Sequence, residues 1–252
     1  MCLNIENYLR RIAFHDQVKV DHRTLAALHR KYIQSVPFEN LDIHYGRKIR
    51  LDLKAIEDKI ISNHKGGFCY ELNSLFGALL GQLGFDVKMI SARVCERGKI
   101  GQEFDHMVLV VKLDEEWLVD VGFGDSFLEP IKIAMGLKQR DPAGYFRIAR
   151  HDPTYLRLEA SKDGLDYSAK YLFTLFKRGL EDFAEMCEYH QTSPESSFTW
   201  EKVSTLAMEN GRITLRGQSL IETRDGHKTV KQVAGKQEFE QILRDRFRID
   251  IS

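Results

Sequence analysis

Apolar side chains recur with a helical period in the region that follows residue 68. They share one face of the predicted helix and comprise Leu72, Leu75, Phe76, Leu79, Leu80 and Leu83. Gly84 comes next and is a natural helix stop. The spacing predicts a helix whose first turn holds Cys69 and whose apolar face packs against a core.

Two earlier stretches show the same period. Residues 24–34 place Leu25, Leu28 and Tyr32 on one face. Asp52 can cap a second helix, whose apolar side chains continue to Ile61. We therefore expect residues 1–85 to form a helical bundle.

From about residue 87 the pattern changes to that of strands and turns. Residues 107–111 are all apolar, which is typical of a strand buried on both faces, and residues 117–121 form a second strand with Asp120 as its only charge. Further strand patterns occur at 145–149, 155–160 and 167–175. Residues 86–190 are thus predicted to form a small β-barrel or curled sheet.

The last part of the chain mixes both kinds of pattern. Strand signals at 212–215 and 229–233 precede a terminal helix with an apolar stripe that includes Phe239 and Phe247. Residues 191–252 are therefore expected to combine helix and strand, and the fold class of the whole chain is α+β.

Composition narrows the class of protein further. Lys and Arg number 37 in the 252 residues, and Asp and Glu also number 37, so no global positive field favours nucleic acid or an anionic membrane as a partner. The N-terminus carries charges where a signal peptide would need its apolar core, and no stretch approaches the length that spans a membrane. We expect a cytoplasmic protein.

The four cysteines are widely separated and form no C-x-x-C pair, which argues against a disulfide scaffold and against a structural zinc site. Cys2, Cys95 and Cys187 lie in terminal, strand-like and helical surroundings, and we assign all three a structural role. We expect no metal, and the chain contains neither a Walker-type loop nor a G-x-G-x-x-G signature.

Cys69 has a different setting, because Gly66 and Gly67 precede it and a helix follows. A free cysteine is usually a small buried hydrophobe. Here the two glycines indicate a positive φ or a close approach of the backbone to a ligand, which a packing cysteine does not need. The start of a helix and the charge of Lys65 should lower the pKa of the thiol, which would make Cys69 a nucleophile.

A thiolate nucleophile needs a base, and the base needs an acceptor that orients it. His106 begins the apolar run and Asp120 lies in the following strand. A hairpin centred on Leu113 sets the two residues opposite each other, whereas one centred on Asp114 makes them diagonal neighbours on the same face. A buried carboxylate needs such a partner, so Cys69, His106 and Asp120 are predicted to act as nucleophile, base and orienter.

Three segments carry a resemblance to the arylamine N-acetyltransferase family. They are Lys-Gly-Gly-Phe-Cys-Tyr-Glu-Leu-Asn at 65–73, Asp-His-Met-Val-Leu-Val-Val at 105–111 and Val-Asp-Val-Gly-Phe-Gly at 119–124. Val-Pro-Phe-Glu-Asn-Leu at 36–41 and Ser-Pro-Glu-Ser-Ser-Phe at 193–198 resemble two further motifs of the family. The resemblance covers about residues 5–230.

The resemblance implies a fold and an activity. The fold would be a helical bundle, a β-barrel and an α/β lid over residues 1–85, 86–190 and 191–252, with a papain-like catalytic core. The activity would be ping-pong acetyl transfer, in which Cys69 takes the acetyl group from acetyl-coenzyme A and an aromatic amine or hydrazine then attacks the thioester. By motif position the catalytic residues are Cys69, His106 and Asp120.

Further residues follow from their positions around these motifs. Phe38, Phe68 and Phe123 are expected to line the acceptor pocket, and Gly122 and Gly124 to let coenzyme A approach the backbone. The partners would be small molecules, and the protein would be a monomer or a homodimer.

Two residues depart from the family's usual pattern. Lys65 stands where most members have arginine, and Glu39 is its expected ion-pair partner. Asp105 stands before His106, where many relatives have a small hydroxyl residue or glycine, and it could alter the pocket rim and the amine preference.

Other functions can use the same three residue types. A cysteine protease or a transglutaminase-like enzyme would be acylated by a peptide or by glutamine. An amide synthase of natural-product biosynthesis resembles the same family but uses a carrier-bound acyl chain. A ligand-binding module with a decayed triad is the non-enzymatic alternative.

Overall fold

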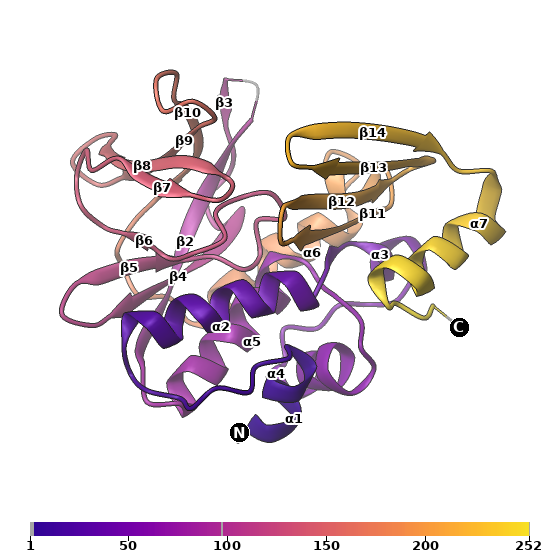
Figure 1. Ribbon diagram of the computed structural model, residues 1–252, viewed down its shortest axis with the longest axis horizontal. Coiled ribbons are helices and arrows are strands. Elements are labelled where there is room, and N and C mark those ends of the chain that lie inside the picture. Colours follow the sequence, from indigo (N-terminus) through magenta and orange to yellow (C-terminus); the bar gives the residue numbers. More distant parts are fainter. Residues whose placement is uncertain (1–2, 97, 252) are drawn as a thin grey trace.

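The computed structural model describes residues 3–96 and 98–251. Helices dominate the first third of the chain, strands the middle and a mixture of both the end, as the sequence predicts (Figure 1). Cys2 lies outside the described residues. The protein therefore has a mixed helix and sheet fold.

Two of the N-terminal helices begin at aspartate caps. Asp21 accepts a hydrogen bond from the Thr24 N–H at the start of α2 (His22–Ser35), and Asp52 does the same for Ala55 at the start of α4 (Leu53–Glu57). The predicted cap at Asp52 is confirmed. The other helical segments here are α1 (Ile5–Arg11), α3 (Leu41–His44), the π-helical turn η1 (Asp58–Ser62) and α5 (Cys69–Gln82).

The larger sheet curls into a nearly closed barrel. Its antiparallel strands follow the order β6-β5-β4-β2-β10-β9-β8-β7, with β3 beside β2. The edges meet where the Gln139 side chain accepts a hydrogen bond from the Lys132 N–H at 2.8 Å and donates one to the Lys132 carbonyl at 2.9 Å. The strands are β2 (Asp86–Glu96), β3 (Lys99–Ile100), β4 (His106–Lys112), β5 (Glu116–Val119), β6 (Ile131–Lys132), β7 (Gln139–Asp141), β8 (Gly144–Arg150), β9 (Leu156–Ser161) and β10 (Ser168–Phe173).

Strand β4 joins the helices to this sheet. Leu109 and Val111 point into the core formed with α2 and α5, while Val108 and Val110 point into the core inside the curled sheet. Both faces of β4 are therefore buried, which explains why the strand is a continuous apolar run.

The smaller sheet contains β11 (Val203–Met208), β12 (Gly211–Arg216), β13 (Ser219–Arg224) and β14 (His227–Gln232), and β1 (Phe38–Glu39) from the first third of the chain pairs with β11. Helix α7 (Gly235–Ile242) and the π-helical turn η4 (Leu243–Phe247) pack on it through an apolar core. In the sequence, the segment between β10 and β11 contains η2 (Leu180–Phe183), α6 (Ala184–Thr192) and η3 (Ser197–Thr199). Phe38 of β1 also forms a β-bridge with Gly67. Strand β1 thus links the glycine turn before Cys69 to the C-terminal part of the chain.

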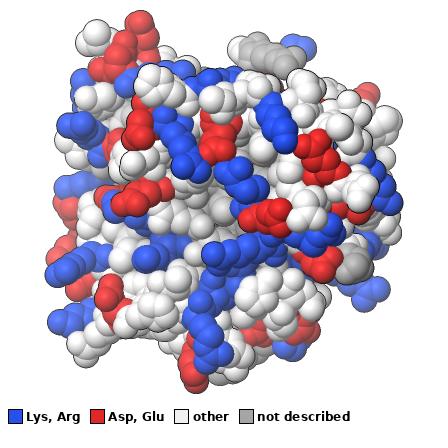
Figure 2. Space-filling model, turned by 45° about the vertical axis from the view of Figure 1, so that its right-hand side comes forward, with Lys and Arg blue, Asp and Glu red and all other residues white. Residues whose placement is uncertain are grey.

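The surface carries charges of both signs. Figure 2 shows Lys and Arg interspersed with Asp and Glu, with a run of basic side chains across the lower middle of this face. No helix within residues 3–96 and 98–251 combines the length and the apolar character that crossing a membrane requires.

Replacing Leu79 tests the packing of α5 in the apolar core that it shares with α2 and β4. Leu79 is fully buried, so Leu79→Ala should lower the free energy of unfolding by about 2–5 kcal/mol, through lost burial and the cavity it leaves. Urea unfolding measures this change. The control Leu165→Ala, at a side chain 79% exposed, should change it by less than about 0.5 kcal/mol. Equal effects of the two substitutions would contradict this packing.

Candidate active site

The hairpin of β4 and β5 sets the relation between His106 and Asp120. Leu109 faces Val119 and Val111 faces Trp117, so the hairpin is centred on Asp114. Of the two predicted registers, the one that makes His106 and Asp120 diagonal neighbours is confirmed. His106 Nε2 lies 2.8 Å from Asp120 Oδ2, and both side chains are buried.

The second oxygen of the Asp120 carboxylate is bound as well. Oδ1 accepts hydrogen bonds from Asn73 Nδ2 and from the Gly122 N–H, each at 3.0 Å. Burial alone would raise the pKa of Asp120, but the charge and hydrogen bond of His106, with help from Asn73, outweigh it and lower the pKa below its usual value. The carboxylate therefore stays ionised at neutral pH.

Asn73 ties this pair to the helix that carries Cys69. Its Nδ2 also donates to the Met107 carbonyl at 2.7 Å, and its Oδ1 accepts from the Val121 N–H at 3.0 Å. This role of Asn73 was not predicted from the sequence. Its spacing of four residues from Cys69, which puts both on one face of α5, is the signal that could have found it.

Gly122 lets the segment after β5 lie directly on the first turn of α5. A Cβ at this position would lie 2.6 Å from Asn73 Nδ2 and 2.8 Å from the Cα of Cys69. Gly124 has φ +84°, and a Cβ there would lie 3.3 Å from the ring of Phe38. Both glycines thus allow close packing within the protein, and their contact with coenzyme A stays a prediction.

Gly66 and Gly67 also serve internal packing. Neither has a positive φ, so this part of the expectation is wrong. A Cβ at Gly66 would lie 2.1 Å from the Pro37 carbonyl oxygen, and one at Gly67 would lie 2.8 Å from Glu71 Oε2. The close approach that the glycines permit is to these groups of the protein itself.

Cys69 is the first residue of α5, and its side chain is buried. Burial raises the pKa of its thiol well above the usual value; a hydrogen bond from the Met107 N–H opposes this rise, and the Asp105 carboxylate adds to it. The expectation that the pKa of this thiol is lowered is therefore wrong, because the effect of burial outweighs that of the helix start. A thiolate at this depth needs a positive charge inside the site.

The expected pocket aromatics have different surroundings. Phe38 lines a cleft of about 820 Å³ together with Asp105, His190 and Phe198. Phe123 packs edge-on to the His106 ring, with centroids 5.3 Å apart. Phe68 is fully buried against Tyr70 and Phe198. Whether the three contact a substrate stays a prediction.

The contacts of Glu39 and Asp105 bear on the two residues that depart from the family's usual pattern, Lys65 and Asp105. The ammonium group beside the Glu39 carboxylate is that of Lys59, at 3.7 Å, so the expected pairing of Glu39 with Lys65 is wrong. The Asp105 carboxylate lies 3.2 Å from His190 Nε2 and accepts a hydrogen bond from the Val94 N–H at 3.3 Å. Asp105 therefore braces the start of β4 against β2 and α6.

A buried histidine behind the site was also missed. His29 Nε2 lies 3.2 Å from the Asp120 carbonyl oxygen and Nδ1 lies 2.9 Å from that of Leu128. Burial lowers the pKa of His29, so its ring is neutral and supports the backbone of Asp120. In the part of the chain that the structure describes, no group of three or more His, Cys, Asp or Glu is placed to hold a metal ion.

Comparisons with known proteins agree with this arrangement. A family model described as N-acetyltransferase matches residues 21–252. The chain is 32% identical to the arylamine N-acetyltransferase, pineal gland isozyme NAT-10, of Gallus gallus, over 99% of this chain and 95% of the relative.

Solved structures show the same fold. An arylamine N-acetyltransferase of Mycobacterium smegmatis is 30% identical, with a TM-score of 0.91 over 99% of this chain and 93% of that one. One from Bacillus cereus, described as having a unique Cys-His-Glu catalytic triad, is 25% identical, with a TM-score of 0.91 over 99% of this chain and all of that one.

The class defined by these findings is that of the N-acetyltransferases, and the protein is an enzyme of the acyltransferase type. More closely, the chain belongs to the arylamine N-acetyltransferase family. The match reaches residue 252, beyond the stretch over which the motifs alone carry the resemblance.

Gly122→Ala tests the packing of Asp120 and its loop on α5. The added methyl group would collide with Asn73 and Cys69, displace the Asp120 loop and slow alkylation of Cys69 by iodoacetamide about 10- to 100-fold at neutral pH. Gly81→Ala on α5 is the control, because its Cβ would make only an ordinary contact, 3.7 Å from Val87. Alkylation at the wild-type rate in Gly122→Ala would show that this close packing does not hold the site together.

Proposed function

We propose that this enzyme moves an acetyl group from acetyl-coenzyme A to arylamines and arylhydrazines by a ping-pong mechanism, through a thioester on Cys69. The observation that carries the proposal is the 2.8 Å hydrogen bond between buried His106 and Asp120, held by Asn73 against the start of α5. The Cys-His-Glu triad described for the Bacillus cereus relative supports a Cys-His-carboxylate triad here.

In the first half-reaction the Cys69 proton passes to His106, and the thiolate attacks the thioester carbonyl carbon. The new sulfur–carbon bond forms, the bond to coenzyme A breaks, and the coenzyme A thiolate takes the proton from His106. Burial raises the pKa of the Cys69 thiol, so His106 has to receive this proton if the thiolate is to form. The Cys69 N–H at the helix start is a candidate donor to the oxyanion.

In the second half-reaction the amine nitrogen attacks the acetyl carbon on Cys69. His106 takes the proton that the nitrogen loses, the carbon–sulfur bond breaks, and Cys69 leaves as the thiolate. Asp120 accepts a hydrogen bond from His106 throughout, which orients the ring and stabilises its positive charge. An aromatic amine suits this step because it is uncharged at neutral pH.

The finer features follow the same proposal. Phe38, Phe68 and Phe123 would form the acceptor pocket, and Gly122 and Gly124 would lie along coenzyme A. The chain would divide into a helical bundle (1–85), a barrel (86–190) and an α/β lid (191–252) around a papain-like core. The enzyme would work without a metal, in the cytoplasm, as a monomer or a homodimer.

A stable acetyl-enzyme tests the ping-pong mechanism directly. Incubation with acetyl-coenzyme A alone should add one acetyl group to Cys69, and a simple arylhydrazine should remove it as the N-acetyl product. Peptide mass spectrometry locates the group, and Cys187→Ala is the control that keeps the reaction. If Cys69 remains free and alkylatable while coenzyme A stays acetylated, acetyl-coenzyme A is not the acyl donor. A peptide or a carrier-bound acyl group is then the next donor to test.

His106→Gln tests where the Cys69 proton goes. Without the base, the buried thiol has only its own raised pKa, so alkylation by iodoacetamide at pH 7 should fall at least about 10-fold. The rate should then climb about tenfold per pH unit beyond pH 9, whereas the wild-type rate should vary little between pH 7 and 9. Identical pH profiles would contradict the pairing of Cys69 with His106.

A further inference from the structure

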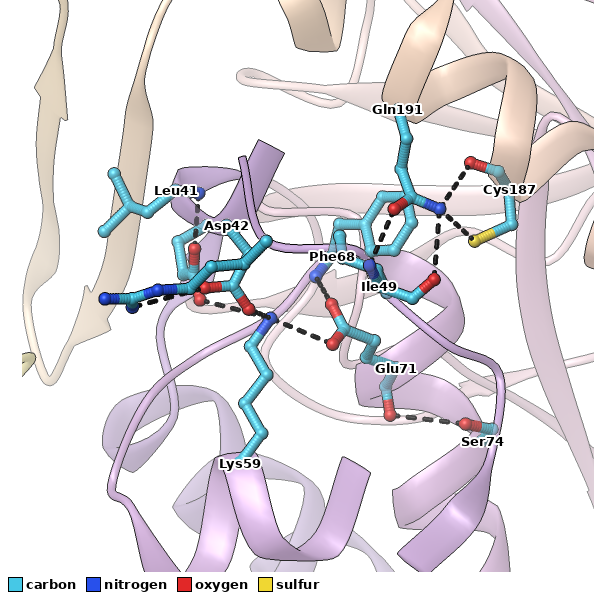
Figure 3. Close-up of polar contacts among 11 residues, drawn as sticks. Leu41, Asp42, Ile49, Lys59, Phe68, Glu71, Ser74, Cys187 and Gln191 are labelled. Atoms are coloured by element: carbon cyan, nitrogen blue, oxygen red, sulfur yellow. Dashed lines mark hydrogen bonds and ion pairs between the residues drawn. The ribbon is translucent and has the colours of Figure 1, made fainter. Parts of the chain in front are cut away.

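A buried ion cluster lies against Gly66 and Gly67, the glycines that precede Cys69. Figure 3 shows its Lys59 ammonium group between Asp42 and Glu71. Lys59 Nζ is 2.8 Å from Asp42 Oδ2, 2.9 Å from Glu71 Oε1 and 3.7 Å from Glu39 Oε1. None of the four side chains is more than 14% exposed. We call this group the Lys59 cluster.

The cluster joins segments that are separate in the sequence. Lys59 comes from η1, Glu39 from β1, Asp42 from α3 and Glu71 from the first turn of α5. Burying an ammonium group with three carboxylates costs several kcal/mol per ion, and replacing buried ion pairs by apolar side chains of similar volume is often neutral or stabilising. The cluster therefore needs a reason other than stability.

Glu71 connects the cluster to the residue before the nucleophile. Its Oε2 accepts a hydrogen bond at 3.1 Å from the N–H of Phe68, the N-cap of α5. Gly67 leaves room for this contact, because a Cβ there would lie 2.8 Å from the same oxygen. A shift of Glu71 would thus move the Gly67–Phe68 peptide and, through Phe68, change the direction of the Cys69 side chain.

We propose that the Lys59 cluster is a positioning device for the nucleophile: it holds the first turn of α5 so that Cys69 faces His106. Lys59 and Glu71 are the positioning residues, acting on Cys69 through Phe68. The inference rests on the proposed role of Cys69.

The charge of Lys59 also governs the state of Glu71. Burial raises the pKa of Glu71 to about 7 and the Glu39 carboxylate adds to the rise, while Lys59 opposes it. Removing the ammonium group would raise this pKa further and increase the protonated fraction of Glu71 at neutral pH. A neutral carboxyl accepts the Phe68 N–H more weakly than a carboxylate does, so the turn would loosen.

Lys59→Met is the central test, with Lys54→Met as its matched control. Lys54 lies one turn earlier, is 61% exposed and pairs with Asp58 at 2.7 Å. Single-turnover acetylation of Cys69 should slow at least about 10-fold in Lys59→Met, with the KM for acetyl-coenzyme A changed less than about twofold. Lys54→Met should match the wild type, and Lys59→Arg should recover most of the rate because it keeps the charge. Circular dichroism verifies that each variant is folded.

A folded Lys59→Met that is acetylated at the wild-type rate would overturn the inference. If Lys59→Met does not fold, Glu71→Gln is the second test. Glutamine keeps the size of the side chain and an oxygen for the Phe68 N–H but loses the charge. A wild-type rate of acetylation in Glu71→Gln would equally overturn the inference. If neither variant folds, the cluster is a stability element and the positioning role is wrong.

Failure of the proposed function can be told apart from failure of this inference. Alkylation of Cys69 by iodoacetamide needs no acyl donor, so it reports on the position of the thiol even if acetyl-coenzyme A is not the substrate. It should slow in Lys59→Met by about the same factor as acetylation does.

Discussion

The hydrogen bond between His106 and Asp120 is the interaction on which the site depends. A carboxylate buried at the end of β5 needs its counter-charge and its donors inside the protein. The register of the β4–β5 hairpin supplies His106, α5 supplies Asn73, and the lack of a side chain at Gly122 lets its N–H reach the carboxylate. Each of these features follows from the need to keep one charge satisfied without water.

Burial also disfavours the thiolate form of Cys69. The thiol is first in α5, but loss of water outweighs the benefit of the helix start, and its pKa rises. Under the proposed mechanism, the active form is an ion pair in which His106 carries the proton. Two buried groups of charges lie on either side of Cys69. The Asp120 carboxylate is held through Asn73 and Gly122, and the Lys59 cluster reaches Phe68 through Glu71.

Much of this architecture could be predicted from the sequence. Period 3.6 predicts α5, an all-apolar run predicts the doubly buried β4, and the even spacing of His106 and Asp120 narrows the hairpin to two registers. Strands β11 and β13 were missed because they mix small polar and charged residues, such as Thr205 and Glu222, with their apolar positions.

The contacts that could not be predicted are those between distant segments. A charge near the glycine turn was expected, but which lysine pairs with Glu39 depends on how η1 packs against β1, and no local pattern encodes this. The raised pKa of Cys69 is likewise a result of burial, which requires the assembled fold. The position of Asn73 beside Cys69 on one face of α5, by contrast, could have been predicted from their four-residue spacing.

The most direct test of the central claim is the protonation state of His106, measured by nitrogen NMR of the imidazole ring at pH 7 in the free enzyme. If Cys69 and His106 form an ion pair, both ring nitrogens carry a proton in the wild type. The ring should be neutral in Cys69→Ser, because the serine hydroxyl does not release its proton to an imidazole at this pH. A neutral His106 ring in both proteins would contradict the ion pair, since the thiolate would then have no partner.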